Sequence, residues 1–263
     1  MRNHRSITPF LVAITVAAGC SSTESPAATD APRAAEPTPS TMLATSSPSN
    51  DVAEPNGLDR VLLSDDFDSD ASGWGGRFQS FEAGAYAWSL PPGQTDVRAA
   101  DALIAIEDRI TQHSTTIEFT APNAAAVAIE CAWEEIEASS RWYSLELSVD
   151  GAAIRKRPPG NDPSVDLAAT DEVTLTDRPT TLEAICVRTA DNYRLSLVVD
   201  GRTVLDTVDT DPYGPGAPNI AVRAATDGSA DDITATFDRF EIRVPADGPT
   251  LPTAATPTPT TTS

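Results

Sequence analysis

The chain has 263 residues, enough for one domain of roughly 190 residues once its low-complexity ends are set aside. Its 18 basic and 39 acidic residues give a net charge of -21, which repels nucleic acid and anionic lipid headgroups, so we expect no nucleic-acid partner. His4 and His113 are the only histidines, which excludes a zinc site built on several histidines in the mature chain and leaves His113 alone for a Ser-His-Asp triad.

Residues 1–20 are typical of a lipoprotein signal peptide. Arg2 and Arg5 precede a short apolar segment, and the ending Ala17-Ala18-Gly19-Cys20 resembles a bacterial lipobox, although Leu is preferred where Ala17 stands. A lipid such as palmitate on Cys20 would anchor the exported protein to the outer face of the bacterial cytoplasmic membrane or to the cell surface. Ordinary cleavage after Ala18 is the alternative.

Two stretches are predicted to be disordered. Residues 21–57 consist largely of Ser, Thr, Ala, Pro and acidic residues, and residues 246–263 end in a Pro/Thr repeat. Such segments have too little apolar surface to offset the entropy lost on ordering. We therefore expect a tether, a folded domain over residues 58–245, and a tail.

The folded part has the alternating pattern of β-strands. Strands are predicted at 61–67, 77–82, 85–90, 115–120, 127–133, 142–149, 181–187, 193–199, 203–206, 220–224 and 234–244. Asp150-Gly151 and Asp200-Gly201 each follow an alternating run and predict hairpin turns, because both residues of such a turn adopt positive φ. Residues 97–109 fit a short helix, with a strand at 102–106 as the alternative.

Cys131 and Cys186 lie in two of these apolar strands. Alternation places Cys131 on one face with Ile129 and Trp133, and Cys186 on one face with Leu182 and Ala184, so both cysteines point into the core. An exported chain meets no reducing thiol pool, which predicts a Cys131–Cys186 disulfide. No Cys-x-x-Cys motif is present, so we expect a structural link rather than a redox-active pair.

Several short motifs, taken in order, resemble the concanavalin A-like jelly-roll domains, and most closely the uncharacterised versions of bacterial surface lipoproteins. They are Leu62-Leu63-Ser64-Asp65-Asp66-Phe67, Ser72-Gly73-Trp74, Gly84-Ala85-Tyr86, Ile129-Glu130-Cys131, Leu182-Glu183-Ala184-Ile185-Cys186, Leu197-Val198-Val199-Asp200-Gly201 and Phe237-Asp238-Arg239-Phe240-Glu241-Ile242. The resemblance implies an all-β sandwich of two antiparallel sheets in which the first and last strands are neighbours. The number of strands and the hairpins agree with it.

This fold hosts glycosidases, whose retaining site resembles Glu-x-Asp-x-x-Glu on one strand. The nearest segment is Glu134-Glu135-Ile136-Glu137, which lacks that spacing and falls where the chain is expected to turn. We interpret it as a solvated loop. The protein is therefore not expected to be an enzyme.

A structural calcium ion is the one cofactor that the sequence suggests. Asp65, Asp66 and Asp68 crowd one turn, and jelly-roll domains often hold calcium between the first and last strands, which would add Asp238. A merely solvated acidic turn is the alternative.

Exposed aromatic rings would provide platforms for sugars. Trp88, Trp142, Tyr193 and Tyr213 are the candidates, whereas Trp74 and Trp133 are predicted to be core residues. The leading hypothesis is a noncatalytic module that binds glycan or another cell-envelope component. A purely structural or protein-interaction domain is the alternative, and a glycosidase comes third.

Overall fold

The computed structural model describes residues 57–68, 73–74, 78–82, 84–136, 139–160, 162–224 and 232–251. The signal peptide with Cys20, nearly all of the tether and residues 252–263 of the tail lie outside the described residues. None of the described helices is both long and apolar enough to cross a membrane.

Eight antiparallel strands form the larger sheet. They are β1 (Arg60–Asp65), β2 (Gln79–Glu82), β3 (Ala85–Leu90), β5 (Gln112–Thr120), β10 (Thr180–Arg188), β11 (Tyr193–Val199), β12 (Arg202–Asp209) and β14 (Ile233–Val244). Their order is β12-β11-β10-β5-β14-β3-β2, with β1 also paired to β14. The first and last strands are therefore neighbours, as the resemblance implies.

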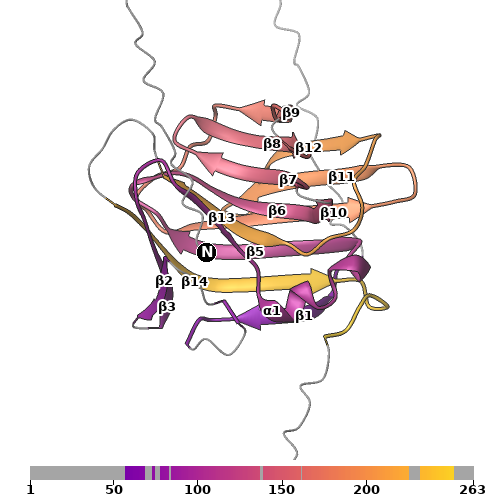
Figure 1. Cartoon of the computed structure of the whole chain (residues 1–263), viewed down its shortest axis with the longest axis horizontal. Coiled ribbons are helices and arrows are strands. Elements are labelled where there is room, and N and C mark those ends of the chain that lie inside the picture. The colour runs from indigo at the N-terminus through magenta and orange to yellow at the C-terminus, as the bar shows by residue number, and fades with distance from the viewer. Residues whose placement is uncertain are drawn as a thin grey trace, which may run out of the picture. The chain divides into compact units, whose positions relative to one another are not determined.

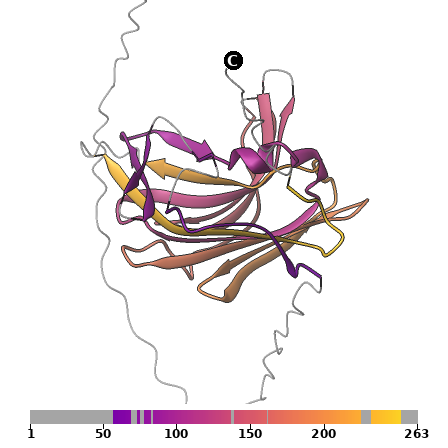
Figure 2. The ribbon, with the colours of Figure 1, turned by 90° about the horizontal axis from the view of Figure 1, so that it is seen from below.

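Six antiparallel strands form the second sheet. They are β4 (Thr95–Arg98), β6 (Ala124–Ile136), β7 (Ser139–Ser148), β8 (Gly151–Arg157), β9 (Val165–Thr170) and β13 (Asn219–Ala224), in the order β4-β13-β6-β7-β8-β9. Strands β6, β7 and β8 lie across β10, β11 and β12 (Figure 1). The turned view shows the strands of both layers curving across the molecule (Figure 2). The all-β, two-sheet jelly-roll sandwich predicted from the sequence is confirmed.

Both predicted hairpins are present. Asp150-Gly151 joins β7 to β8, and Asp200-Gly201 joins β11 to β12 with φ of 50° and 76° at its two residues. Three strands of the structure, β4, β8 and β9, were not predicted from the sequence. Each of the three completes the six-stranded sheet next to an apolar strand, so pairing decides their conformation where propensity is weak.

Of the two alternatives for residues 97–109, the short helix is confirmed and the strand at 102–106 is wrong, although the helix covers less than the predicted range. A four-residue helix, α1 (Asp101–Ile104), is followed by a 3₁₀ turn, η1 (Glu107–Arg109), at the margin of the sandwich (Figures 1 and 2). Leu103 and Ile106 are buried in the core, which holds the segment in place. The predicted loop at 134–137 is also wrong, because β6 continues to Ile136 and Glu134 pairs with Arg141.

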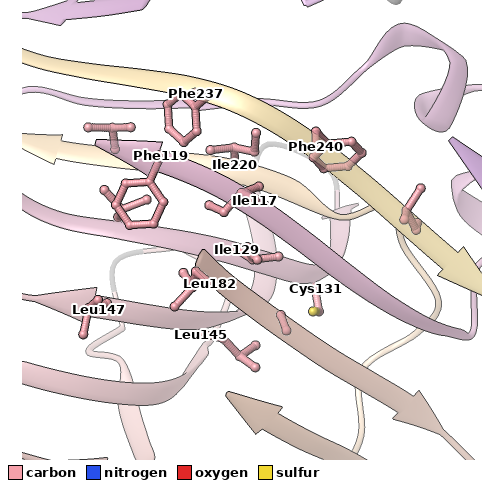
Figure 3. Packing of buried hydrophobic residues seen from close by; sticks show 14 of the residues in the cluster. Ile117, Phe119, Ile129, Cys131, Leu145, Leu147, Leu182, Ile220, Phe237 and Phe240 are labelled. Carbon is pink, nitrogen blue, oxygen red and sulfur yellow. The ribbon is translucent and has the colours of Figure 1, made fainter. Parts of the chain in front are cut away.

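The core lies between the sheets and contains the disulfide. Figure 3 shows Ile117, Phe119 and Leu182 of the larger sheet packed against Ile129, Leu145 and Ile220 of the smaller one. Cys131 of β6 and Cys186 of β10 are fully buried and bonded to each other, so the predicted link joins the two layers covalently.

We predict that replacing both Cys131 and Cys186 by Ala lowers the free energy of unfolding by about 4 kcal/mol, because the bond closes a loop of 55 residues. Denaturant unfolding of the two proteins measures the difference. Reductant should lower the midpoint of the wild type and leave that of the double variant unchanged. A loss below about 1 kcal/mol would show that the link contributes little.

Candidate functional site

A β-bulge in β6 turns Trp133 onto the outer face of the six-stranded sheet, the face directed away from the other sheet. Cys131 pairs with Tyr143 and Glu134 with Arg141, so Ala132 and Trp133 together oppose the single residue Trp142. Ala132 takes the extra turn with φ of 54°, a conformation that residues with a Cβ rarely adopt. Trp133 is partly exposed, and its prediction as a core residue is wrong.

The loop before β13 holds this bulge in place. A Cβ on Gly216 would lie 2.5 Å from the carbonyl oxygen and 2.6 Å from the nitrogen of Trp133, so only glycine allows the two backbones to pack this closely. Tyr213 anchors the loop: its N–H donates to the Tyr143 hydroxyl at 3.0 Å, and its carbonyl accepts from Arg188 Nε at 2.8 Å.

A pocket of about 430 Å³ opens beside Trp133, between the edge of the sheet and α1. Its apolar lining includes Trp133 and Val97, and its polar lining includes Arg98, Asp101 and Asn219. An aromatic ring together with guanidinium, carboxylate and amide groups offers both an apolar platform and partners for hydroxyl groups.

Three side chains form a row that leads away from this pocket across the strands. The rings of Trp133 and Trp142 stack with their centroids 4.6 Å apart and their planes at 24°. Arg157 of β8 is the register partner of Trp142, and its Cζ lies 5.9 Å from the Trp142 ring. We call this row of Trp133, Trp142 and Arg157, together with the pocket, the Trp-Arg face.

Beside the row, the same face carries a charge network on five strands. Arg223 of β13 donates to Glu146 of β7 at 2.6 Å and to Glu130 of β6 at 3.2 Å. Arg155 of β8 pairs with Glu146 and, at 2.8 Å, with Asp166 of β9. The two glutamates are 0% and 2% exposed, so arginines cover them and tie the strands together.

This network leaves three polar atoms without partners. Among the described residues, Glu130 Oε2, Trp142 Nε1 and Arg157 Nε are buried and make no hydrogen bond. Burial raises the pKa of Glu130 to about 7, against the opposing influence of Arg223, Arg157 and Trp142. Burial also lowers the pKa of Arg157, and Arg223 lowers it further. Unsatisfied polar atoms this close together are uncommon in a native protein and suggest a binding site.

Three of the four predicted sugar platforms are wrong. Trp88 is 1% exposed and Tyr193 is 0% exposed, because alternation along β3 and β11 directs both rings into the core. Trp142 lies on the outer face, as predicted, but its ring is enclosed by Trp133 and Arg157. Trp74 is buried, as predicted.

Tyr213 is also wrong as a sugar platform, because it is 7% exposed and packs in the core. Its ring lies 5.0 Å from that of Tyr143, and Lys156 Nζ and Arg141 Cζ lie 4.7 and 4.8 Å from its centroid. Tyr213 therefore acts on the Trp-Arg face only by positioning the loop that contacts Trp133.

The four proposed calcium ligands differ in burial and in their hydrogen-bond partners. Asp65 is buried and accepts hydrogen bonds from Phe67 N at 2.8 Å and Trp74 Nε1 at 2.9 Å. Asp66, Asp68 and Asp238 are exposed. In the described part of the chain, these four carboxylates do not form a group with metal-binding spacing. Calcium binding stays a prediction.

One compact group of potential metal ligands does occur in the described residues: His113, Cys131 and Cys186. The two sulfurs are bonded to each other, so neither is a thiolate that could hold a metal. His113 Nδ1 contacts Thr115 Oγ1 at 2.9 Å, and the imidazole packs in the core with no exposure. The group therefore belongs to the core.

Comparison with known proteins identifies no family. No family model matches the chain, and no curated protein matches it. Among solved structures, the carbohydrate-binding module CBM66 from Bacillus subtilis is 13% identical, with 66% of this chain and 96% of that chain covered and a TM-score of 0.49.

Two glucanases are similar at the same level. The Bacillus licheniformis beta-glucanase is 10% identical, covering 68% of this chain and 96% of its own, with a TM-score of 0.45. A prokaryotic beta-1,3-1,4-glucanase from a mouse hindgut metagenome is 14% identical, covering 70% and 98%, with a TM-score of 0.43. These similarities concern the fold and assign neither a ligand nor a reaction.

We predict that Gly216→Ala lowers the free energy of unfolding by about 2 kcal/mol, because its Cβ would overlap the Trp133 backbone. Gly214→Ala is the matched control in the same loop. Its Cβ would lie 3.1 Å from Glu134 Oε2, the movable end of a side chain, so the expected loss is small. Equal denaturation midpoints for the two variants would contradict the contact that holds the bulge.

We predict that His113 makes stability fall as the pH falls below about 6.5. Burial lowers the pKa of His113 from 6.5 to about 3, so below pH 6.5 the unfolded chain binds a proton that the folded protein does not. Between pH 6.5 and 5 the wild type should lose about 2 kcal/mol more than His113→Gln. Denaturant unfolding of both proteins at the two pH values checks this, and parallel losses would refute it.

Proposed function

We propose that this protein is a noncatalytic glycan-binding module whose ligand lies on the Trp-Arg face. One observation carries the proposal: the bulge at Ala132 turns the Trp133 ring out of the core and into the wall of the pocket. Positive φ at a residue with a Cβ costs roughly 1–2 kcal/mol, and such outliers concentrate at functional sites.

The chemistry around Trp133 suits a sugar. A pyranose ring presents C–H groups on one side, which pack against an aromatic ring, and hydroxyl groups at its edge. The polar pocket residues Arg98, Asp101 and Asn219 would exchange hydrogen bonds with those hydroxyl groups. The second tryptophan of the row backs the first, so the platform is rigid before the ligand arrives.

The proposed role is noncatalytic. The two carboxylates that line the pocket, Asp101 and Glu107, both come from the helical segment on one side of it. Glu130 and Glu146 are the acidic residues of the outer face with the least exposure, and both are bonded to Arg223 beneath the surface. Glu134 is paired with Arg141 at 2.7 Å. A glycosidase needs two carboxyl groups that flank the scissile bond directly.

The place of action is part of the proposal. The disulfide fits an oxidising compartment outside the cytoplasm. With Cys20 lipidated, the module would stand on a tether at the outer face of the cytoplasmic membrane or at the cell surface, where cell-envelope polysaccharides are the glycans within reach.

We predict that Trp133→Ala weakens binding on an array of cell-envelope oligosaccharides at least about tenfold, the loss expected for a stacked ring of this size. Val208→Ala, at a residue of β12 that is 52% exposed, is the control and should bind as the wild type does. Thermal unfolding of each variant confirms that the fold is retained.

Two outcomes would oppose the proposal. Wild-type protein that binds no glycan on the array would favour the structural or protein-interaction alternative. Release of reducing sugar from a bound oligosaccharide would show that the module is an enzyme, in which case Asp101 and Glu107, the carboxylates that line the pocket, become the first residues to replace.

A further inference from the structure

We propose that the ligand of the Trp-Arg face is an anionic saccharide and that Arg157 pairs with its negative group. This inference rests on the glycan-binding function proposed above and specifies its substrate class. The negative group is a carboxylate, a sulfate or a phosphate, all of which offer oxygen atoms to a guanidinium in the same way.

Among the described arginines of the outer face, Arg157 differs in having no carboxylate within ion-pair distance, although Glu130 and Asp166 attract it from further away. Arg155 and Arg223 are bonded to glutamates, and Arg98 pairs with Asp96 at 3.0 Å. Within the part of the chain that the structure describes, no acidic oxygen lies within 4.0 Å of the Arg157 nitrogens, and its buried Nε has no acceptor. A partly buried guanidinium in this state has lost hydration without gaining a hydrogen bond.

The surrounding charges make an external anion the natural partner. Arg155 and Arg223 stand near Arg157, and the carboxylates of Glu130 and Glu146 are already engaged by them. A carboxylate brought by the ligand would meet a planar donor fork and a neighbouring positive charge.

The layout of the row suits a linear chain of sugars. The pocket lies at β4 and β13, Trp133 on β6, Trp142 on β7 and Arg157 on β8, in the order of the strands across the sheet. Neighbouring strands are about 4.8 Å apart, so the path from β13 to β8 spans about 15 Å. A saccharide of several units can therefore stack on Trp133 and reach Arg157 with a later unit.

The net charge of -21 restricts the kind of anion. At physiological salt the Debye length is about 8 Å, so the protein's net negative charge repels a single distant anionic group only weakly. The total repulsion grows with each further charge on a long polyanionic ligand. Arg157 supplies one unpaired positive charge. We therefore expect preference for sparsely charged saccharides over densely charged polymers.

Paired probes test the inference. Oligomers of galacturonate, glucuronate and mannuronate are compared with their methyl esters, which keep the sugar chain and remove the charge, and with sulfated and phosphorylated oligosaccharides of equal length. Titration calorimetry should show that at least one acidic form binds about tenfold or more tightly than its uncharged counterpart. The preferred probe then identifies the anion.

Arg157→Gln should abolish this preference. The variant should bind the acidic oligomer only as tightly as the methyl ester, and its affinity for the ester should be unchanged. Arg157→Lys, which keeps the charge but loses the planar fork, should retain part of the preference. Arg202→Gln, at an exposed arginine of β12, is the control and should bind as the wild type does.

The failure of this inference can be told apart from the failure of the proposed function. Equal binding of acidic and uncharged probes, or a preference that survives in Arg157→Gln, overturns the anionic ligand while a neutral glycan stays bound through Trp133. No binding by any probe on the array or in this set overturns both.

Discussion

Ala132 connects Cys131, whose side chain is in the core, to Trp133, whose ring lies on the outer face of the sheet. Cys131 is fixed by its bond to Cys186 in the opposite sheet, and two residues later the Trp133 ring lies on the outer face. Ordinary alternation would place both side chains on one side. The left-handed conformation of Ala132 is the local solution, and it persists because the disulfide on one side and Gly216 on the other leave the backbone no easier path.

The proposals for the outer face depend on the bulge at Ala132, which turns the Trp133 side chain to that face. Trp133 stacks on Trp142 only because the bulge brings both residues to the same side of the sheet. The pocket gains an aromatic wall for the same reason. The charge network lies beside the row, and its arginines link side chains of strands that the backbone ladder already holds in one sheet.

The sequence predicted the fold better than the site. Alternation and two Asp-Gly turns were enough for most strands, and the count of cysteines was enough for the link between the layers. Trp133 was assigned to the core because its position follows Ile129 and Cys131 in strict alternation, and no local signal marks Ala132 as a bulge. The cause is Gly216, more than eighty residues later, which only the folded chain brings into contact.

The charged residues of the face were missed for a related reason. Glu130 and Glu146 interrupt apolar strands at alternate positions, a visible sign of a polar outer face, but their partners depend on strand order. Strand β8, which carries Arg155 and Arg157, was not predicted, although the Asp150-Gly151 turn implies a returning strand. Trp88 and Tyr193 were chosen for aromatic character, and the facing of their strands decides against them. Tyr213 was chosen because it lies in a Pro/Gly loop, but that loop packs its ring into the core.

Hydroxyl-radical footprinting of the four tryptophans tests the outward turn of Trp133 most directly. After brief exposure of the folded protein, mass spectrometry of its peptides should show oxidation at Trp133 and Trp142, with Trp74 and Trp88 protected because they are 0% and 1% exposed. A Trp133 as protected as Trp74 would place its ring in the core and contradict the account of this face.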